Sequence, residues 1–390
     1  MVEQRKFSLS KGPYIRKADF KQNTSTMMFD FLLALTPLII FAWYKNGIMP
    51  YNEGTIGFIQ MLYPLLFVLI GGLTAVVVEG LYYSIFSKEE NVLEKIKHSF
   101  AVIPGVLLAM VLPLYTPIWV LVIGVIFGVV IGKLIFGGFG YNLFNPALVG
   151  YIFIVTAFYG VITATNKGYL NGSEINIVTG ATPLTNFFSN FPNGTMDQAL
   201  APYGSLTNFF IGTIPGSIAE TSSLLCLLAL VYLLVRRVIN WRIPLVYLGT
   251  VLVLSIFLGY FLGYTQDYEV GNKIIRTLDY RFPLFNLFSG GLMFGAVFMA
   301  TEPVTSPRTP NGKIVFALFL GAITIMLRYL GKPEGVASSI LFMNIFTPLL
   351  DSIFAKVRVS DNRKKVILTY VYVGIGVLAV FGFTLMQLGA

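Results

Sequence analysis

The sequence predicts an all-α polytopic membrane protein with two inverted five-helix repeats and an extra C-terminal transmembrane helix. Composition is the first reason: 56% of the 390 residues are hydrophobic, only 12% are charged, and mean hydropathy is +0.76. A soluble domain has about 25% charged residues, so this chain lacks the polar surface that water requires. Several apolar runs also reach the roughly 20 residues that cross a bilayer core as a helix. The third reason is that the order of these runs repeats.

The chain is expected to begin with a cytoplasmic tail over 1–26. This polar, basic stretch is far longer than the charged region of a cleavable signal peptide. Eleven apolar segments follow, and each is predicted to cross the membrane once: 27–44, 57–86, 100–112, 117–136, 143–159, 220–235, 244–264, 284–302, 313–330, 334–354 and 366–388.

These segments divide the chain into a first repeat (27–159), an outer loop (160–219) and a second repeat (220–354). A basic inner loop and the extra helix occupy 355–390. In each repeat a short or Gly/Pro-interrupted apolar piece precedes full helices. Five crossings per repeat, an odd number, place the repeats upside down to each other. Inverted repeats with interrupted helices indicate a site near the bilayer midplane.

The distribution of basic residues predicts the orientation in the cell membrane. With the N-terminus inside, 20 Lys and Arg residues lie on the inner side and seven on the outer side. This asymmetry is what membrane topology requires, and it places 160–219 outside. It also accounts for the net charge of +9, so nucleic acid is not expected as a partner.

Scarce residues limit the chemistry. The chain has one cysteine, Cys226, and one histidine, His98. Iron–sulfur clusters, haem and zinc each need thiolate or imidazole ligands, usually several of them. We therefore expect no metal site, and any electron carrier should be organic, held by backbone and hydroxyl groups.

The most informative motif is Thr179-Gly180-Ala181-Thr182-Pro183-Leu184, in the predicted outer loop. A threonine hydroxyl is a good anchor for a phosphoester. Gly180 and Ala181 keep the backbone open to a bulky group, and Pro183 restrains the chain after the anchor. Phe187 and Phe188 follow as candidate walls for a ring. As a bare pattern, Thr-Gly-Ala is also common in ordinary loops.

A second motif, Gly137 to Gly150, breaks a helix with Gly and Asn-Pro. Asn142 and Asn145 offer donors and acceptors to a flavin ring or to a dehydrated cation. The alternative is that both merely cap the broken helix. Membrane-level acids are ion-path candidates, above all Glu79 and Glu302. Glu302 could equally be a solvated interfacial carboxylate, and Asp30 and Asp351 are expected to be interfacial.

The motif at 179–184 closely resembles the covalent flavin site in the D component of the Rnf electron-transport complex. The related B component of the sodium-translocating NADH:quinone oxidoreductase carries a similar site. The segments 137–150 and 300–307 also resemble this family, and the resemblance covers 28–354. It implies that FMN is joined through its phosphate to the hydroxyl of Thr182. It also implies a ten-helix core similar in fold to urea transporters.

The resemblance further implies a function: relay of electrons through the covalent FMN, coupled to transport of Na⁺ or H⁺ across the lipid membrane. The implied partners are the other Rnf subunits (A, B, C, E and G) and a flavin transferase for maturation. Some relatives also carry a non-covalent riboflavin. Two alternatives remain open, namely the quinone-reactive B component and a flavin-free solute channel of the same fold.

Overall fold

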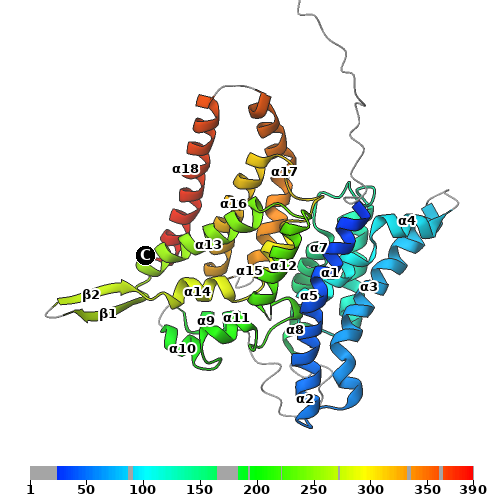
Figure 1. Cartoon of the computed structure of the whole chain (residues 1–390), viewed down its shortest axis with the longest axis horizontal. Helices are drawn as coiled ribbons and strands as arrows, with labels where there is room; N and C mark the ends of the chain where they lie inside the picture. Colours follow the sequence, from blue (N-terminus) through cyan, green and yellow to red (C-terminus); the bar gives the residue numbers. More distant parts are fainter. Residues whose placement is uncertain are drawn as a thin grey trace, which may run out of the picture.

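The computed structural model describes residues 24–86, 91–164, 183–191, 194–220, 222–270, 273–331, 335–359 and 363–389. Within these ranges helices are the regular elements of the first half of the chain (Figure 1). Their bounds are α1 Thr24–Trp43, η1 Tyr44–Ile48, α2 Met49–Asn52, α3 Phe58–Phe86, α4 Val92–Ser99, α5 Val102–Val111, α6 Ile118–Val129, η2 Val130–Leu134, α7 Pro146–Ala157 and α8 Tyr159–Ala164.

The rest of the chain adds further helices and one two-stranded antiparallel hairpin, in which Thr265 pairs with Leu278 and Val270 with Lys273. The bounds are α9 Pro183–Asn190, α10 Met196–Leu200, α11 Leu206–Ile211, η3 Ile218–Glu220, α12 Ser223–Val235, α13 Arg242–Phe261, β1 Thr265–Val270, β2 Lys273–Leu278, α14 Arg281–Phe288, α15 Leu292–Phe294, η4 Gly295–Met299, α16 Pro310–Tyr329, α17 Gly335–Val359 and α18 Arg363–Leu388.

The predicted all-α polytopic membrane class is confirmed. Among the described residues, six helical stretches are long and apolar enough to cross a membrane: Thr24–Asn52, Phe58–Phe86, Arg242–Phe261, Pro310–Tyr329, Gly335–Ala355 and Ile367–Leu388. Four shorter apolar helices and one bent pair coincide with the other predicted segments. The bent pair, Arg281–Phe288 and Leu292–Met299, turns by 62° at its break.

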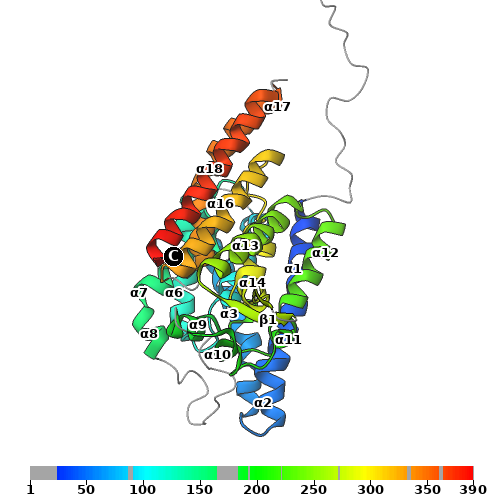
Figure 2. The same ribbon diagram turned by 90° about the vertical axis from the view of Figure 1, so that its left-hand side faces the viewer.

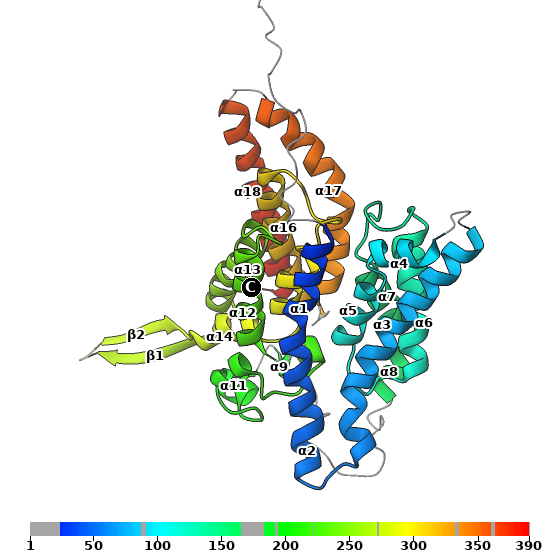
Figure 3. The same ribbon diagram turned by 45° about the vertical axis from the view of Figure 1, so that its right-hand side comes forward.

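The two halves repeat the same pattern of helix contacts. In the first half α3 packs against α4, α5 and α6, and α6 packs against α7. In the second half α13 packs against α14, η4 and α16, and α16 packs against α17. α1 lies beside α12 and also contacts α3 (Figure 3). Asp30 near the start of α1 pairs with Arg236 just after the end of α12, so these two corresponding helices run antiparallel. That is the relation an inverted repeat requires.

The outward faces of the long helices are apolar. Ile59 is 78% exposed, Leu81 58% and Leu378 67%. Side chains of this kind are stable on a surface that faces lipid. α18 packs against α16 and α13 outside the repeat plan (Figure 2), and only 11% of its apolar window is buried. It is the extra C-terminal helix that the sequence predicted.

Two predictions about connections were wrong. The segment 160–219 was expected to be loop throughout, but α9, α10 and α11 lie within it, because short runs such as Phe187-Phe188 have a core to pack against. The hairpin β1–β2, which projects from the side of the molecule (Figure 1), was missed. Its strands, TQDYEV and KIIRTL, are shorter and more polar than the apolar segments on which the prediction rests.

Candidate functional site

The predicted site residues fall into three groups. Thr179, Gly180, Ala181 and Thr182 lie outside the described residues. Glu79, Asn142, Asn145 and Glu302 lie around the helix ends on the side that the sequence predicts to be cytoplasmic. That side is called inner below and the opposite side outer, after the prediction. Phe187 lies on α9, in the outer segment that follows the motif.

A fully buried ion pair occupies the inner part of the first repeat. Glu79 of α3 is 0% exposed, and its carboxylate accepts hydrogen bonds from the Lys133 ammonium and the Ser99 hydroxyl. Lys133 also donates to the Ser99 carbonyl at 2.8 Å. Desolvating two charges costs several kcal/mol each, and mutual attraction repays this only when further hydrogen bonds satisfy both groups. Here Ser99 supplies those bonds to both partners.

This pair corrects the charge count used for orientation. Lys133 was counted as an inner-loop residue, but it lies on η2 and is 2% exposed. Arg328, counted on the outer side, is likewise buried at 0%. One charge leaves each side of the count, so the predicted asymmetry persists.

An inner cavity adjoins the ion pair, and both repeats contribute to it. It is small, with a volume of about 30 Å³. A three-ring system would need the lining side chains to move apart. The lining combines aromatic and apolar residues with three polar ones: Met28, Phe31, Phe100, Ile103, Pro104, Leu107, Lys133, Phe139, Asn142, Pro146, Glu302 and Pro303.

The two asparagines of the broken helix differ in role. Asn145 caps α7, because its Oδ1 accepts from the Ala147 and Leu148 amides at 3.0 and 3.3 Å. Its amide nitrogen reaches the Met299 carbonyl at 3.5 Å in the other repeat. Asn142 lines the inner cavity, and its buried Oδ1 has no hydrogen-bond partner among the described residues. Of the two, Asn142 is the one available to a ligand.

The membrane-level acids are also distinct in their surroundings. Glu302 is half-buried, accepts from the Thr305 hydroxyl at 3.0 Å and lines the cavity. Asp30, expected at the interface, is 5% exposed and is bound at 3.0 and 3.1 Å by Arg236, whose side chain is 47% exposed. Asp351 accepts from the Arg308 and Thr309 amides. Only Glu302 of these three faces the cavity.

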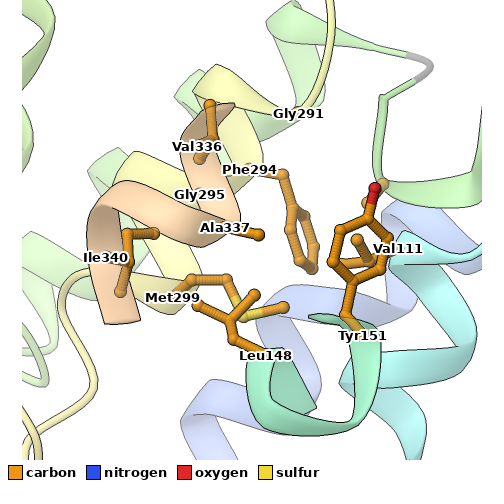
Figure 4. Close-up of a pocket in the computed structure, with 11 residues that line it drawn as sticks. Val111, Leu148, Tyr151, Gly291, Phe294, Gly295, Met299, Val336, Ala337 and Ile340 are labelled. Carbon is orange, nitrogen blue, oxygen red and sulfur yellow. The ribbon is translucent and has the colours of Figure 1, made fainter. Parts of the chain in front are cut away.

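A second small cavity, which is apolar, lies at the other end of α5 from the inner cavity (Figure 4). It lies where α5 ends and the bent pair breaks, and its lining is Val111, Leu148, Tyr151, Ala219, Gly291, Phe294, Gly295, Met299, Val336, Ala337 and Ile340. An ion in such surroundings would lose its hydration without replacement, at high cost. This apolar cavity is therefore unsuited to holding an ion.

An aromatic cluster lies on the outer side, directly after the motif. Phe187 is 3% exposed, and its ring lies 5.9 Å from that of Tyr264 and 5.2 Å from that of Phe285, measured between centroids. Phe188 and Phe191 both contact Tyr329, with ring centroids 5.2 and 5.6 Å away. Among the described residues, the cluster consists of Phe187, Phe188, Phe191, Tyr203, Phe209, Tyr264, Phe282, Phe285 and Tyr329.

A buried cation lies beside this cluster. The guanidinium of Arg328 donates to the carbonyls of Asn286 and Ser289, at 2.6 and 3.1 Å, where α14 ends. The last carbonyls of a helix lack partners within it and carry its negative dipole end, so a cation is favourable there. Tyr329 next to it donates to the Asn286 side chain at 3.0 Å.

The sequence pattern of the NQR2, RnfD, RnfE family matches residues 8–360. The chain belongs to this family. It is 33% identical to the D component of the proton-translocating ferredoxin:NAD(+) oxidoreductase complex of Clostridium ljungdahlii, over 93% of this chain and 98% of the relative. It is also 33% identical to the D component of the Na(+)-translocating ferredoxin:NAD(+) oxidoreductase complex of Acetobacterium woodii, over 92% and 96%.

The other branch of the family is represented by the B component of the Na(+)-translocating NADH-quinone reductase of Chromohalobacter salexigens. Identity to it is 33%, over 67% of this chain and 60% of that relative. The family resemblance stated from the motifs is thus confirmed. All three relatives are named as subunits of ion-translocating oxidoreductases.

Three polar residues of these sites were missed from the sequence: Lys133, Ser99 and Arg328. A signal existed for the two cations, since each lies inside a predicted apolar segment, 117–136 or 313–330. A charge within a membrane segment marks function or a buried partner. Ser99 carried no such signal, because its role depends on where α4 ends.

Proposed function

We propose that this chain is the D-type membrane subunit of an Rnf-type ion-translocating ferredoxin:NAD⁺ oxidoreductase. In this proposal FMN is esterified through its phosphate to Thr182 on the outer side. The FMN supplies the redox chemistry, and the protein holds and orients it. The observation that carries the proposal is the six-residue motif 179–184 in a chain that aligns with nearly the whole length of two D-type Rnf relatives.

The described residues around the motif fit such a group. α9 is described from Pro183 onward, the residue that follows Thr182 in the sequence. In this proposal the phosphate lies near the N-terminal end of that helix, where unpaired amides and the positive end of the dipole favour an anion. The aromatic cluster that begins at Phe187 provides flat apolar surface for a ring system. Arg328 lies beside it.

For the ion, the inner cavity is the proposed entry point, with Glu302 and Asn142 as its polar groups. The charge of Glu79 is already neutralised by Lys133. Glu79 is therefore better suited to a proton or ion relay, in which the ion pair rearranges, than to a permanent cation site. Two relatives of equal identity are named for different ions, H⁺ and Na⁺. The same cavity is the proposed place for a non-covalent riboflavin, provided that its walls move.

Partners follow from the same proposal. The complex would comprise the other Rnf subunits (A, B, C, E and G), and a flavin transferase would attach the FMN. The N-terminus and the inner cavity would face the cytoplasm, and the flavin motif would lie outside the cell membrane. The clustering of Lys and Arg in the predicted inner segments supports this orientation.

The quinone-reactive B component is the second candidate. The coverage of relatives favours the Rnf assignment over it, because this chain spans 98% of one D-type Rnf relative but 60% of the B-type relative. A flavin-free channel is the third, and it differs from both in predicting an unmodified Thr182.

One experiment separates these candidates. The chain is expressed with a flavin transferase and inspected under ultraviolet light on a denaturing gel, where covalent flavin fluoresces. We expect a fluorescent band that Thr182→Ala abolishes and that Thr207→Ala, a matched control at an exposed position of α11, retains. A dark wild-type band would refute the flavin assignment. Quinone reduction by the assembled complex, lost when Asn142 is replaced, would favour the B-type alternative.

A further inference from the structure

Two cations lie together at the inner ends of neighbouring helices in the second repeat. Arg242 is the first residue of α13 and Lys313 is the fourth residue of α16, and these two helices pack against each other. Both residues are half-buried. The Lys313 ammonium lies close enough to Arg242 for the two charges to repel each other. Two like charges in a partly dry place are unfavourable unless an anion lies nearby.

Neither cation forms an ion pair with a carboxylate among the described residues. Arg242 donates to the Asn240 side chain at 3.4 Å and lies over the Trp241 ring, 5.1 Å from its centroid. Lys313 is attracted by Asp351, but that carboxylate accepts its hydrogen bonds from two amides and a hydroxyl just before α16. The two cations thus share at most one carboxylate in the described part of the chain, and the place keeps a positive charge.

An exposed apolar strip runs along α13 from this pair toward the middle of the membrane span Arg242–Phe261. Leu245 and Val253 are each 50% exposed, and a Cβ added to Gly249 between them would meet open space. These three residues are four positions apart, so they follow one side of the helix. Leu245 is also three positions after Arg242, which places the cation at the inner end of the same side.

The extra helix α18 borders this place. Tyr370 of α18 lies within electrostatic reach of Arg242. Further along, a Cβ on Gly376 of α18 would lie 2.9 Å from the Phe319 ring of α16, so the two helices approach closely there. The pair of cations is therefore enclosed by elements from three spanning helices, α13, α16 and α18.

We propose that Arg242 and Lys313 bind the phosphate of an anionic phospholipid, whose acyl chains lie along the apolar strip of α13. Both cations stand at the ends of membrane spans, which is the level of the lipid headgroups. Basic pockets between membrane helices bind anionic headgroups in this way. Trp241, 49% exposed beside the pair, is of a residue type that concentrates at this level.

A phospholipid is favoured over an acidic segment of a partner protein because it matches two features with one molecule. Its headgroup supplies the missing negative charge, and its chains cover the strip at Leu245, Gly249 and Val253. An acidic segment would match the charge alone.

The test is a lipid titration of the purified full-length chain in detergent micelles, with bound lipid counted by native mass spectrometry. We expect the wild type to bind phosphatidylglycerol, which is anionic, more tightly than zwitterionic phosphatidylcholine. Arg242→Gln with Lys313→Gln should bind phosphatidylglycerol about 30-fold more weakly, and Lys313→Gln alone about fivefold more weakly, because each basic side chain attracts the headgroup. Arg242→Lys with Lys313→Arg keeps both charges and should stay close to wild type.

The matched control is Lys97→Gln with Arg308→Gln, which removes two exposed cations on the same side of the molecule. It has the same net charge as the double Gln variant and should bind phosphatidylglycerol as the wild type does. If the control loses as much affinity, the attraction is a property of the whole inner surface and the site is refuted. Thermal unfolding without added lipid shows that each variant is folded.

Two outcomes on the wild-type chain need no variant. Equal binding of the two lipids would overturn the inference and would leave an acidic partner as the source of the counter-charge. Release of bound phosphatidylglycerol by inorganic phosphate would show that the pair binds free phosphate instead. A wild-type affinity in the folded double Gln variant would equally contradict the proposed site.

Discussion

Each repeat buries a cation where a short helix ends, and the two places bind their cations differently. They are called the inner corner, after α4, and the outer corner, after α14. At the inner corner Lys133 is matched by a carboxylate, Glu79, and both are closed off from solvent. At the outer corner Arg328 binds two main-chain carbonyls at the end of α14. The fork of a guanidinium can reach two carbonyls at once, whereas an ammonium acts as a point charge. Both repeats therefore bury a cation against main-chain carbonyls, but they use different cations to do so.

Among the variants that test this comparison, Lys133→Met is expected to change the free energy of unfolding most. It leaves the Glu79 carboxylate buried without its counter-charge, which should lower the free energy of unfolding by about 3–5 kcal/mol. Reversible unfolding in mixed micelles measures this. The double variant Glu79→Leu with Lys133→Met should recover most of the loss, because it removes both charges. A double variant as unstable as the single one would show that the ion pair is not the reason.

Exchanging the two cations gives a smaller effect. Arg328→Lys replaces a fork by a single ammonium, so one of the carbonyls of Asn286 and Ser289 loses its donor, at about 1–3 kcal/mol. Lys133→Arg inserts a larger group into a closed site, with a comparable cost of about 1–3 kcal/mol. The same unfolding measurement applies. If neither exchange changed the free energy of unfolding, the two corners would not discriminate between lysine and arginine.

The smallest effect is expected at the helix cap between the repeats. Asn145→Ala removes the acceptor for the Ala147 and Leu148 amides and should cost about 1 kcal/mol. Asn145→Asp keeps the acceptor and should retain most of that stability, although it loses the amide donor toward Met299. Thermal unfolding of the two variants compares them directly. An Ala variant equal to wild type would contradict the capping role and reopen a ligand role for Asn145.

Much of the fold could be predicted from the sequence because lipid imposes a length and a polarity on every spanning helix. All eleven apolar segments coincide with helices or a bent helix pair in the described residues. The family was identified from the motif at 179–184, and the match over 8–360 confirmed it. The flavin at Thr182 and the ion roles of Glu79 and Glu302 stay predictions, to be decided by the experiments above.

The chain by itself determined which segments enter the membrane, because hydropathy is a property of local composition. It also placed a hydroxyl next to a helix-starting proline at 182–183. Only the tertiary structure decided that Lys133 meets Glu79 across 54 positions of sequence, and that Arg328 meets Ser289 and lies beside Leu184. Such contacts depend on how helices pack side by side. Packing sums many weak, non-local interactions, which no short stretch of sequence contains.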